Sequence, residues 1–166
     1  DTTWITEISH ERRFSNIGAL KISLFHHWIS NVVDLLPIAP SFEASGNIGS
    51  GKRYGIELES TIPLNLLGLE GARLDMKVRL QDSSVVDPIT ESNRQFSSIG
   101  GHGLIFFDAD NTYAYDVKFR QDLESLRVAW GINILDTSDR PLFKANELDI
   151  YNEGISVGIF VETTRW

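Results

Sequence analysis

The chain lacks cysteine and contains a single methionine among its 166 residues. Without cysteine it can form no disulfide, thiolate metal site or cysteine nucleophile. It has no long apolar run, so no segment is suited to a membrane-spanning helix. It also lacks an excess of positive charge, because 15 Lys and Arg oppose 23 Asp and Glu, giving a net charge of −8. This balance argues against a nucleic-acid partner, since neutralising phosphates requires clustered Lys and Arg.

The composition that remains is that of one folded domain. Hydrophobic residues make up 42% of the chain and charged residues 23%, which excludes a disordered tail. The length suits one ordinary domain and is short for two.

Apolar residues recur with a period of two rather than 3.6, which predicts strands with one apolar and one polar face. The cleanest run is "ARLDMKVRLQ" (residues 72–81), where Ala, Leu, Met, Val and Leu alternate with Arg, Asp, Lys, Arg and Gln. The same alternation occurs in residues 113–121, 126–134 and 155–163, and more weakly in 19–28 and 52–60. Residues 3–14 and 141–151 are strand-like but mixed on both faces.

These runs predict about eight antiparallel strands and no convincing helix. Residues 64–72 have a helical composition, but Gly68 and Gly71 interrupt them. Short links are expected at 15–18, 63–71, 121–125 and 151–154, and long ones at 34–51, 82–111 and 136–146. Short and long links that alternate between ten-residue strands are typical of a transmembrane β-barrel. This assignment directs the last strand toward the long-loop end, so one returning strand would be missing.

Two kinds of barrel fit the alternation. A soluble barrel points its apolar face inward, whereas a membrane barrel turns that face toward lipid and lines its lumen with charge. Aromatic residues favour the membrane barrel, because Trp28, Tyr54, Tyr113 and Tyr115 are expected near the long-loop end, as in an interfacial girdle. Aromatic residues are also good strand formers, and Trp166 falls on the polar face by strict alternation.

Several stretches resemble one family. They are "GNIGSGKRYGIELESTIPL", "GARLDMKVRLQDSSVVDPIT", "YDVKFRQDL", "LFKANELDIYNEG" and "FVETTRW". Together they are similar to the C-terminal part of the barrel of TonB-dependent outer-membrane receptors. In that family an Asn-Gly-rich stretch precedes an aromatic-Gly-aliphatic-Glu-aliphatic-Glu strand late in the barrel, as Asn47 to Glu59 do here.

The resemblance implies a bacterial outer-membrane receptor that imports a scarce ligand, such as a siderophore, cobalamin or an oligosaccharide. It implies a 22-stranded barrel, an N-terminal plug and a segment that engages the TonB energy-coupling protein. No plug or coupling segment is recognisable in residues 1–166. At the number of residues that each strand and its loop take up here, 22 strands would need roughly 450 residues. We therefore interpret the chain as a single segment, of about eight strands, of a larger up-and-down barrel. Its expected partners are outer-membrane lipid, the rest of the barrel, the plug and the imported ligand.

One motif suggests different chemistry. Gly46, Gly51 and Lys52 match most of the phosphate-binding pattern G-x-x-x-x-G-K-[ST]. Such a loop must lead into a helix and supply a Ser or Thr for magnesium. Here a strand pattern follows, and Arg53 occupies the Ser/Thr position, so no nucleotide is expected. No catalytic constellation, metal site or cofactor site is predicted either, because His26 and His27 point to opposite faces and no nucleophile elbow is present.

The charged strand face is the main candidate for a site. In a membrane barrel this face would line the lumen, where its side chains could contact the ligand or the plug. The alternative is a purely structural role, in which these charged residues form ion pairs with one another across neighbouring strands. The candidates are Arg53, Glu57, Glu59, Arg73, Asp75, Lys77, Arg79, Asp116, Lys118 and Arg120. Four loop aromatics are further candidates for ligand contact, or for packing among the loops: Phe42, Phe96, Phe106 and Phe107.

Transport by an outer-membrane barrel is therefore the leading hypothesis. A soluble, lipocalin-like barrel of eight strands that binds a small apolar ligand is the alternative. A small eight-stranded membrane barrel with a structural or adhesive role is a third possibility.

Overall fold

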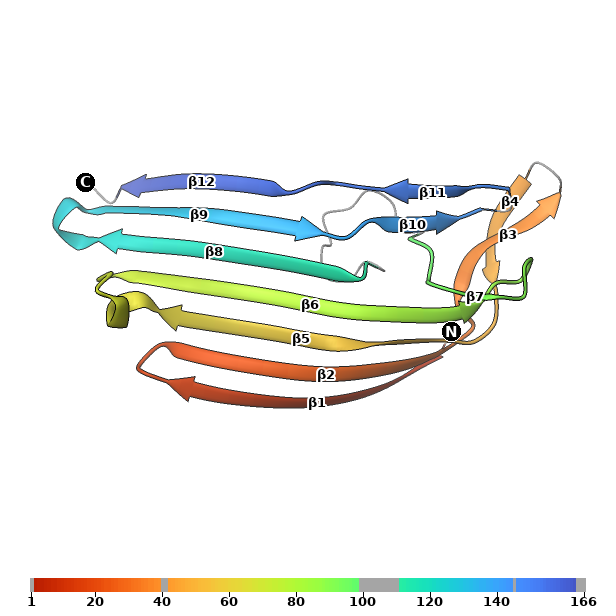
Figure 1. Cartoon of the computed structure of the whole chain (residues 1–166), viewed down its shortest axis with the longest axis horizontal. Helices are drawn as coiled ribbons and strands as arrows, with labels where there is room; N and C mark the ends of the chain where they lie inside the picture. The colour runs from red at the N-terminus through yellow and green to blue at the C-terminus, as the bar shows by residue number, and fades with distance from the viewer. Residues whose placement is uncertain (1, 40–41, 99–110, 145, 164–166) are drawn as a thin grey trace.

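The computed structural model describes residues 2–39, 42–98, 111–144 and 146–163. They form an all-β, antiparallel structure dominated by one sheet (Figure 1). Along the sheet, every strand pairs antiparallel with the next. The seven strands of this path, in order, are β1 (Thr2–Phe14), β2 (Gly18–Ser30), β5 (Gly51–Pro63), β6 (Ala72–Val86), β8 (Tyr113–Leu123), β9 (Val128–Thr137) and β12 (Ser156–Thr163).

The remaining strands are short and lie at one end of the sheet (Figure 1). β7 (Asn93–Arg94) extends the sheet beside β6, while β3 (Val33–Ala39) pairs with β4 (Phe42–Asn47) and β10 (Arg140–Phe143) with β11 (Leu148–Tyr151). Two 3₁₀ turns, η1 (Leu64–Leu67) and η2 (Glu124–Leu126), are the helical elements in the described part of the chain. None of the described helical segments has the length and apolar character needed to cross a membrane.

Short and long connections fall at opposite ends of the sheet. The β1–β2, β5–β6 and β8–β9 connections are short, whereas β3–β4, β7 and β10–β11 lie in the long ones. We refer to the two ends as the short-turn end and the long-loop end. This separation agrees with the alternating link lengths expected from the sequence.

One strand was predicted wrongly. Residues 141–151 are not a single strand but most of the β10–β11 hairpin, which turns between Phe143 and Leu148. The Lys144 amide donates to the Glu147 carbonyl at 2.9 Å, and the Lys144 ammonium pairs with Glu147 and Asp149. The chain reverses within the segment, which is why its apolar residues looked mixed on both faces.

The hairpin also corrects the direction of the last strand. The predicted link at 151–154 is not a turn between neighbouring strands, because β11 and β12 run one after the other in the same direction (Figure 1). β12 pairs directly with β9, from Ser156 opposite Leu135 to Thr163 opposite Val128. It therefore runs toward the short-turn end, opposite to the prediction.

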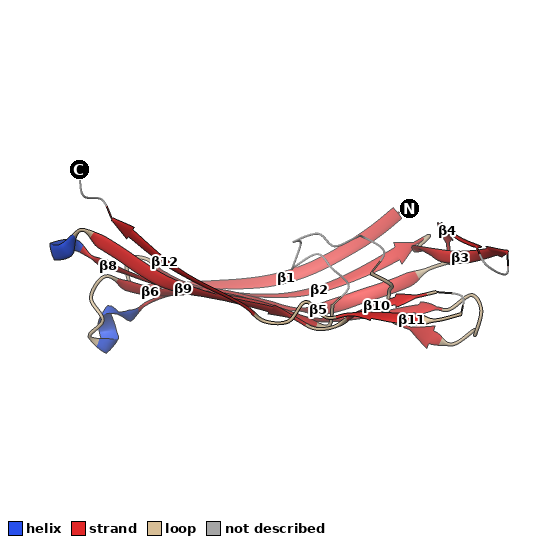
Figure 2. Ribbon diagram, turned by 90° about the horizontal axis from the view of Figure 1, so that it is seen from above, coloured by secondary structure: helices blue, strands red, loops and turns tan. Residues whose placement is uncertain are grey.

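The sheet is open and twisted within the described residues, with β1 and β12 as its edges (Figure 2). No closed barrel is formed there. Among the described residues, buried hydrophobic side chains are few, and Val32, Val85 and Phe96 form a cluster at the long-loop end. This small core is the consequence of a single-layer sheet, since no second layer covers either face in the described part of the chain.

Phenylalanine rings from neighbouring strands lie close to Gly131 and Gly55. A Cβ built on Gly131 would lie 2.6 Å from the Phe160 ring and 2.3 Å from the Phe119 carbonyl oxygen. One built on Gly55 would lie 2.8 Å from the Phe25 ring and 2.3 Å from the Leu80 carbonyl oxygen. Glycine at these positions leaves room for each ring to lie close against the neighbouring strand.

Candidate functional site

The strand register gathers the predicted charged residues on one face. Glu57 lies opposite Arg79, and Glu59 opposite Lys77, across the β5–β6 pair. On the next pair, Lys77 faces Asp116, Asp75 faces Lys118 and Arg73 faces Arg120. Residues opposite one another in a ladder share a face. Arg53 is four residues before Glu57 on β5, and because strand side chains alternate with a period of two, it lies on the same face. We call this surface the charged face.

Ion pairs connect the charged face across its strands. The Arg79 guanidinium donates from Nε and Nη2 to Glu57 Oε2 at 2.9 and 2.6 Å. Lys77 Nζ lies 3.7 Å from Glu57 and 3.6 Å from Glu59. A structural role is therefore sufficient to explain these charged side chains, since they form ion pairs with one another, which is the alternative to ligand contact given by the sequence.

Further pairs follow along the face. Lys118 Nζ lies 2.6 Å from Asp116 Oδ2, and Arg73 Nε lies 3.1 Å from Asp75 Oδ2. Arg53 Nη2 lies 3.3 Å from His27 Nδ1. All ten predicted residues thus belong to one polar surface, while their contact with a ligand or plug stays a prediction.

The ten candidates predicted from the sequence leave out several members of this face, although the alternation of residues 155–163 already placed Glu162 on the polar side. Arg120 bridges to Glu162 of β12 at 3.0 Å, and also to Asp122 at 2.9 Å. Glu11 of β1 lies opposite Lys21 of β2, which lies opposite Glu59. The period-two pattern of residues 19–28 already placed Lys21 opposite its apolar side chains, whereas β1 was mixed and gave no signal for Glu11.

One row of charges alternates in sign across five neighbouring strands. It consists of Glu11, Lys21, Glu59, Lys77 and Asp116, each opposite the next. A depression of about 410 Å³ lies over this row, and Asp75 and Lys118 line it as well. Because both signs are present, the depression suits a polar, hydrogen-bonding occupant better than a purely anionic one.

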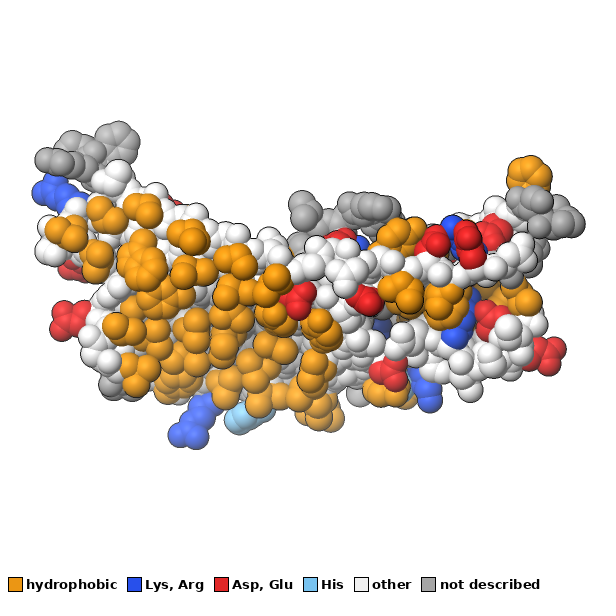
Figure 3. All heavy atoms as spheres, turned by 45° about the horizontal axis from the view of Figure 1, so that its top comes forward, with side chains coloured by type: hydrophobic (Ala, Val, Ile, Leu, Met, Phe, Trp, Pro, Cys, Tyr) orange, Lys and Arg blue, Asp and Glu red, His pale blue; other side chains and the backbone are white. Residues whose placement is uncertain are grey.

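The opposite face of the sheet is apolar and exposed. Its central side chains include Leu24 on β2, Ile56 on β5 and Leu80 on β6, which lie opposite one another. On β12, Ile159 is 74% exposed and Val161 71% exposed. Figure 3 shows apolar side chains gathered continuously over the part of the sheet nearer the short-turn end. We call this surface the apolar face.

Polar residues interrupt the apolar face mainly near its borders. Lys52 and Asp82 lie toward the long-loop end, where Lys52 is two residues before Tyr54 on β5 and Asp82 lies opposite Tyr54 on β6. On edge strand β1, His10 lies opposite Ile22 and Arg12 opposite Leu20. Arg12 is close to the short-turn end of its strand, which ends at Phe14.

Aromatic side chains mark the border of the apolar face toward the long-loop end. The His26 ring is tilted against the Trp28 ring, with centroids 3.9 Å apart, and is stacked with the Tyr54 ring at 5.9 Å. Tyr113 and Tyr115 stack at 6.3 Å on β8. This is the placement expected from the sequence, and it forms a belt with apolar rings and polar tips.

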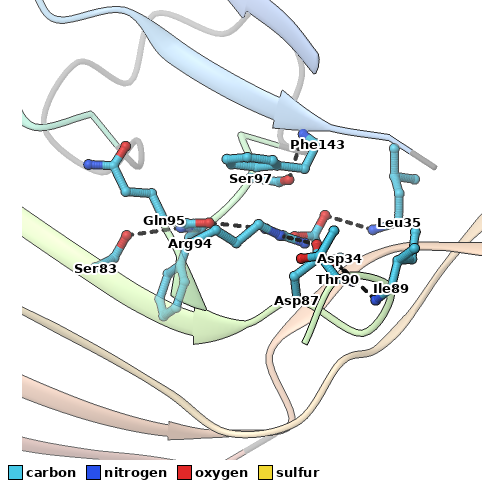
Figure 4. Close-up of polar contacts among 11 residues, drawn as sticks. Asp34, Leu35, Ser83, Asp87, Ile89, Thr90, Arg94, Gln95, Ser97 and Phe143 are labelled. Carbon is cyan, nitrogen blue, oxygen red and sulfur yellow. Dashed lines mark hydrogen bonds and ion pairs between the residues drawn. The ribbon is translucent and has the colours of Figure 1, made fainter. Parts of the chain in front are cut away.

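A second polar cluster lies at the long-loop end, where it joins segments far apart in the sequence (Figure 4). Arg94 Nη2 lies 2.8 Å from Asp34 Oδ2 on β3, and Arg94 Nε lies 2.6 Å from Asp87 Oδ2. The guanidinium also lies over the Phe143 ring of β10, 4.4 Å from its centroid. The Asp34 residue is 1% exposed, so this ion pair is shielded from water.

Backbone groups complete the cluster. The Phe143 amide donates to Ser97 Oγ at 3.0 Å, and the Ser98 amide donates to the Pro141 carbonyl at 2.8 Å. The cluster therefore holds the β3–β4 hairpin, β7 and the β10–β11 hairpin together.

The Asp87 carboxyl has a strongly shifted pKa. Burial alone would raise it, but hydrogen bonds from the Thr90 amide, the Arg94 guanidinium and the Ile89 amide outweigh burial and lower the pKa to about 2. Asp87 is therefore ionised at neutral pH and acts as a hydrogen-bond acceptor that shapes the loop.

The predicted loop aromatics have different positions. Phe42 is 72% exposed on β4 and presents its ring to solvent. Phe96 is 5% exposed and packs against Val32 and Val85, so it contributes to loop packing and has little surface for a ligand. Phe106 and Phe107 lie outside the described residues.

The phosphate-loop pattern leads into β5 rather than a helix, as expected, and Lys52 is part of that strand. Among the described residues no group of three or more His, Asp or Glu side chains is placed to hold a metal ion. Comparisons with protein-family models, with curated proteins and with solved structures gave no match. The functional argument therefore depends on the sheet itself.

Proposed function

We propose that this chain is part of the wall of a transmembrane β-barrel in a bacterial outer membrane. The observation that carries the proposal is the contrast between the two faces of one sheet. One face exposes Ile, Leu and Val side chains over neighbouring strands, while the other carries a lattice of ion pairs. In water, each of these aliphatic side chains forgoes about 1.5–3 kcal/mol of burial free energy.

A membrane accounts for both faces at once. Lipid covers the apolar face, and a wet lumen solvates the charged face. The aromatic belt of Trp28, Tyr54 and Tyr113 then lies at the membrane–water interface near the long-loop end. The loop cluster around Arg94 projects beyond that belt into the aqueous phase.

We propose import of a scarce ligand as the role of this barrel. The resemblance to TonB-dependent receptors supports this role, as does the polar depression over Lys21, Glu59 and Lys77. Ligand, plug and energy-coupling protein are the partners that the role requires. The ligand would be of the siderophore, cobalamin or oligosaccharide class.

The membrane placement can be tested with the full-length protein and lipid vesicles. We expect the protein to float with the vesicles, and brominated lipids to quench Trp4, Trp28 and Trp130, which share the apolar face. Full solubility without detergent, together with unquenched fluorescence, would contradict the placement.

The transport role needs a separate test in cells. Deleting the gene should reduce uptake of one radiolabelled probe among a ferric siderophore, cobalamin and an oligosaccharide, and dissipating the proton-motive force should have the same effect. Unchanged uptake of all three would contradict import and leave the membrane placement standing.

A further inference from the structure

Two cationic side chains lie on the apolar face, one near each of its borders. Lys52 of β5 lies opposite Trp28 on β2 and Ser84 on β6, toward the long-loop end. Arg12 of β1 lies opposite Leu20, toward the short-turn end. Both are exposed, and within the described part of the chain neither side chain forms an ion pair or a hydrogen bond. They are positive charges without a partner on a surface that faces lipid in the proposed placement.

Each of these cations is followed in the sequence by a second one on the opposite face, because successive strand side chains alternate. Arg53 Nη2 lies 3.3 Å from His27 Nδ1, and Arg13 Nε lies 2.6 Å from Glu11 Oε1. Among the described residues, the chain thus supplies polar partners to these two cations of the charged face and none to the two of the apolar face.

Asp82 is an acidic side chain on the same face as Lys52, but it has other partners. The Tyr54 hydroxyl donates to Asp82 Oδ2 at 3.3 Å. The Ser83 amide and the Gln95 side-chain amide donate to Oδ1 at 2.8 and 3.3 Å. No ion pair joins Asp82 to Lys52, so the Lys52 ammonium is available to a partner outside the described residues.

The spacing of the two cations matches the height of an apolar band. Arg12 lies in the row of Ser60, which is eight residues from Lys52 on β5. Eight residues at about 3.3 Å each span about 26 Å along a strand, or roughly 20 Å of depth at a tilt of about 40°. The apolar band of a membrane barrel is about 25 Å tall, and the flexible stems of Lys and Arg extend toward its edges. Both charged groups can therefore reach the headgroups while their stems stay against the acyl chains.

We propose that Lys52 and Arg12 bind the phosphate groups of anionic membrane lipids, one at each border of the apolar face. An ammonium or a guanidinium donates charge-assisted hydrogen bonds to a phosphate. A headgroup with net negative charge is preferred to a zwitterionic one, because the ammonium of a zwitterionic headgroup already neutralises its phosphate. This inference rests on the proposed membrane placement and adds a headgroup preference at two defined positions.

Quenching of site-specific probes by brominated lipid tests the preference. Leu80→Cys places a probe one strand over and four residues along from Lys52, and Ile22→Cys places one a strand over and two residues along from Arg12. Both parent side chains are exposed on the apolar face. Bimane would be attached to either cysteine in the full-length protein, on a background without other cysteines.

The vesicles contain equal amounts of phosphatidylglycerol and phosphatidylcholine, and only one of the two lipids is brominated in each sample. We expect brominated phosphatidylglycerol to quench both probes at least about twofold more strongly than brominated phosphatidylcholine at low ionic strength. Because salt screens the pairing, about 0.5 M NaCl should reduce this difference.

Substitutions assign the preference to the two cations. Each probe should lose the preference when its own nearby cation is replaced, as in Lys52→Gln or Arg12→Gln. Arg53→Gln and Arg13→Gln remove the adjacent charges of the opposite face and are the matched controls, which should keep the preference.

Equal quenching by the two lipids in the parent protein would overturn the proposal, as would equal effects of a variant and its control. In both cases quenching by either lipid would still support the membrane placement. Absence of quenching by both lipids would contradict the placement as well.

Discussion

At the scale of single residues, Arg94 and Arg79 illustrate two different uses of an ion pair. Arg79 and Glu57 lie half-buried on the charged face, where cross-strand pairs contribute about 0.2–1 kcal/mol. Arg94 holds Asp34, which is almost fully buried. Removing one partner of a buried pair leaves an uncompensated charge, at a cost of about 3–5 kcal/mol. The stability of the β3–β4 and β10–β11 hairpins at the long-loop end therefore depends on Arg94 far more than the stability of the sheet depends on Arg79.

Arg94→Gln should loosen the long-loop end and leave the sheet intact. The substitution leaves Asp34 buried without its cation and removes the contact with Phe143. Limited proteolysis should then cut within residues 33–47 or 138–155 at least tenfold faster than in the parent protein. Arg127→Gln, at an exposed turn, is the control; equal rates for the two variants would contradict the role given to Arg94.

The low pKa of Asp87 predicts an acid-sensitive loop. A carboxyl whose pKa is lowered from 3.8 to about 2 stabilises the folded loop fully above pH 3.8, and this contribution is lost as pH falls toward 2. Protection of the amides of residues 87–98 against exchange, relative to the intrinsic exchange rate at each pH, should therefore fall over that range. In the Asp87→Asn variant these amides should be less protected at neutral pH, and the loss of protection at acid pH should disappear. If that acid-dependent loss persists in the variant, the titration belongs to another group.

At the scale of elements, hydrophobic alternation predicted the long strands well because each has one apolar and one polar environment. β6 is the clearest case, since Leu74, Met76 and Val78 share the apolar face in the structure. The β10–β11 hairpin was missed because it lies beyond the apolar face, where no two-sided environment imposes a period on its residues. A turn of ordinary residues between Phe143 and Leu148 also carries no Asn-Gly or Asp-Gly signal.

Gly131 of β9 gives a prediction at this scale. Gly131→Ala should destabilise the sheet by about 1–3 kcal/mol, because its Cβ would meet the Phe160 ring and the Phe119 carbonyl oxygen. Gly158→Ala on β12 is the matched control, since the nearest atom to its Cβ would be 3.9 Å away. Urea unfolding in detergent micelles would measure both, and equal stability of the two variants would contradict close packing at Gly131.

At the scale of the whole molecule, sequence reasoning found the faces but not the long-range contacts. The ten charged candidates could be placed on one side because alternation needs only local information. The cluster of Asp34, Asp87 and Arg94 could not be predicted, because its members come from separate loops and meet only when the hairpins fold over the end of the sheet. Glu11 was missed for a related reason, since its charged neighbours belong to other strands.

The strand directions also bear on the alternatives that the sequence left open. An eight-stranded barrel, soluble or in a membrane, needs one more full strand between β12 and β1 than the path of the sheet contains. A larger barrel needs an odd number of additional strands and preserves the exposed apolar face for lipid. The larger barrel therefore requires no change in the observed sheet.

The central claim is that one face of this sheet lies against lipid and the other against water, and nitroxide scanning of β12 tests it most directly. Single cysteines would replace Ser156 to Ile159, Val161 and Glu162 in the vesicle-bound, full-length protein. Collisions with oxygen, which concentrates in lipid, should be frequent at 157, 159 and 161. Collisions with a water-soluble nickel complex should be frequent at 156, 158 and 162. Equal access of the nickel complex to both sets would contradict the account.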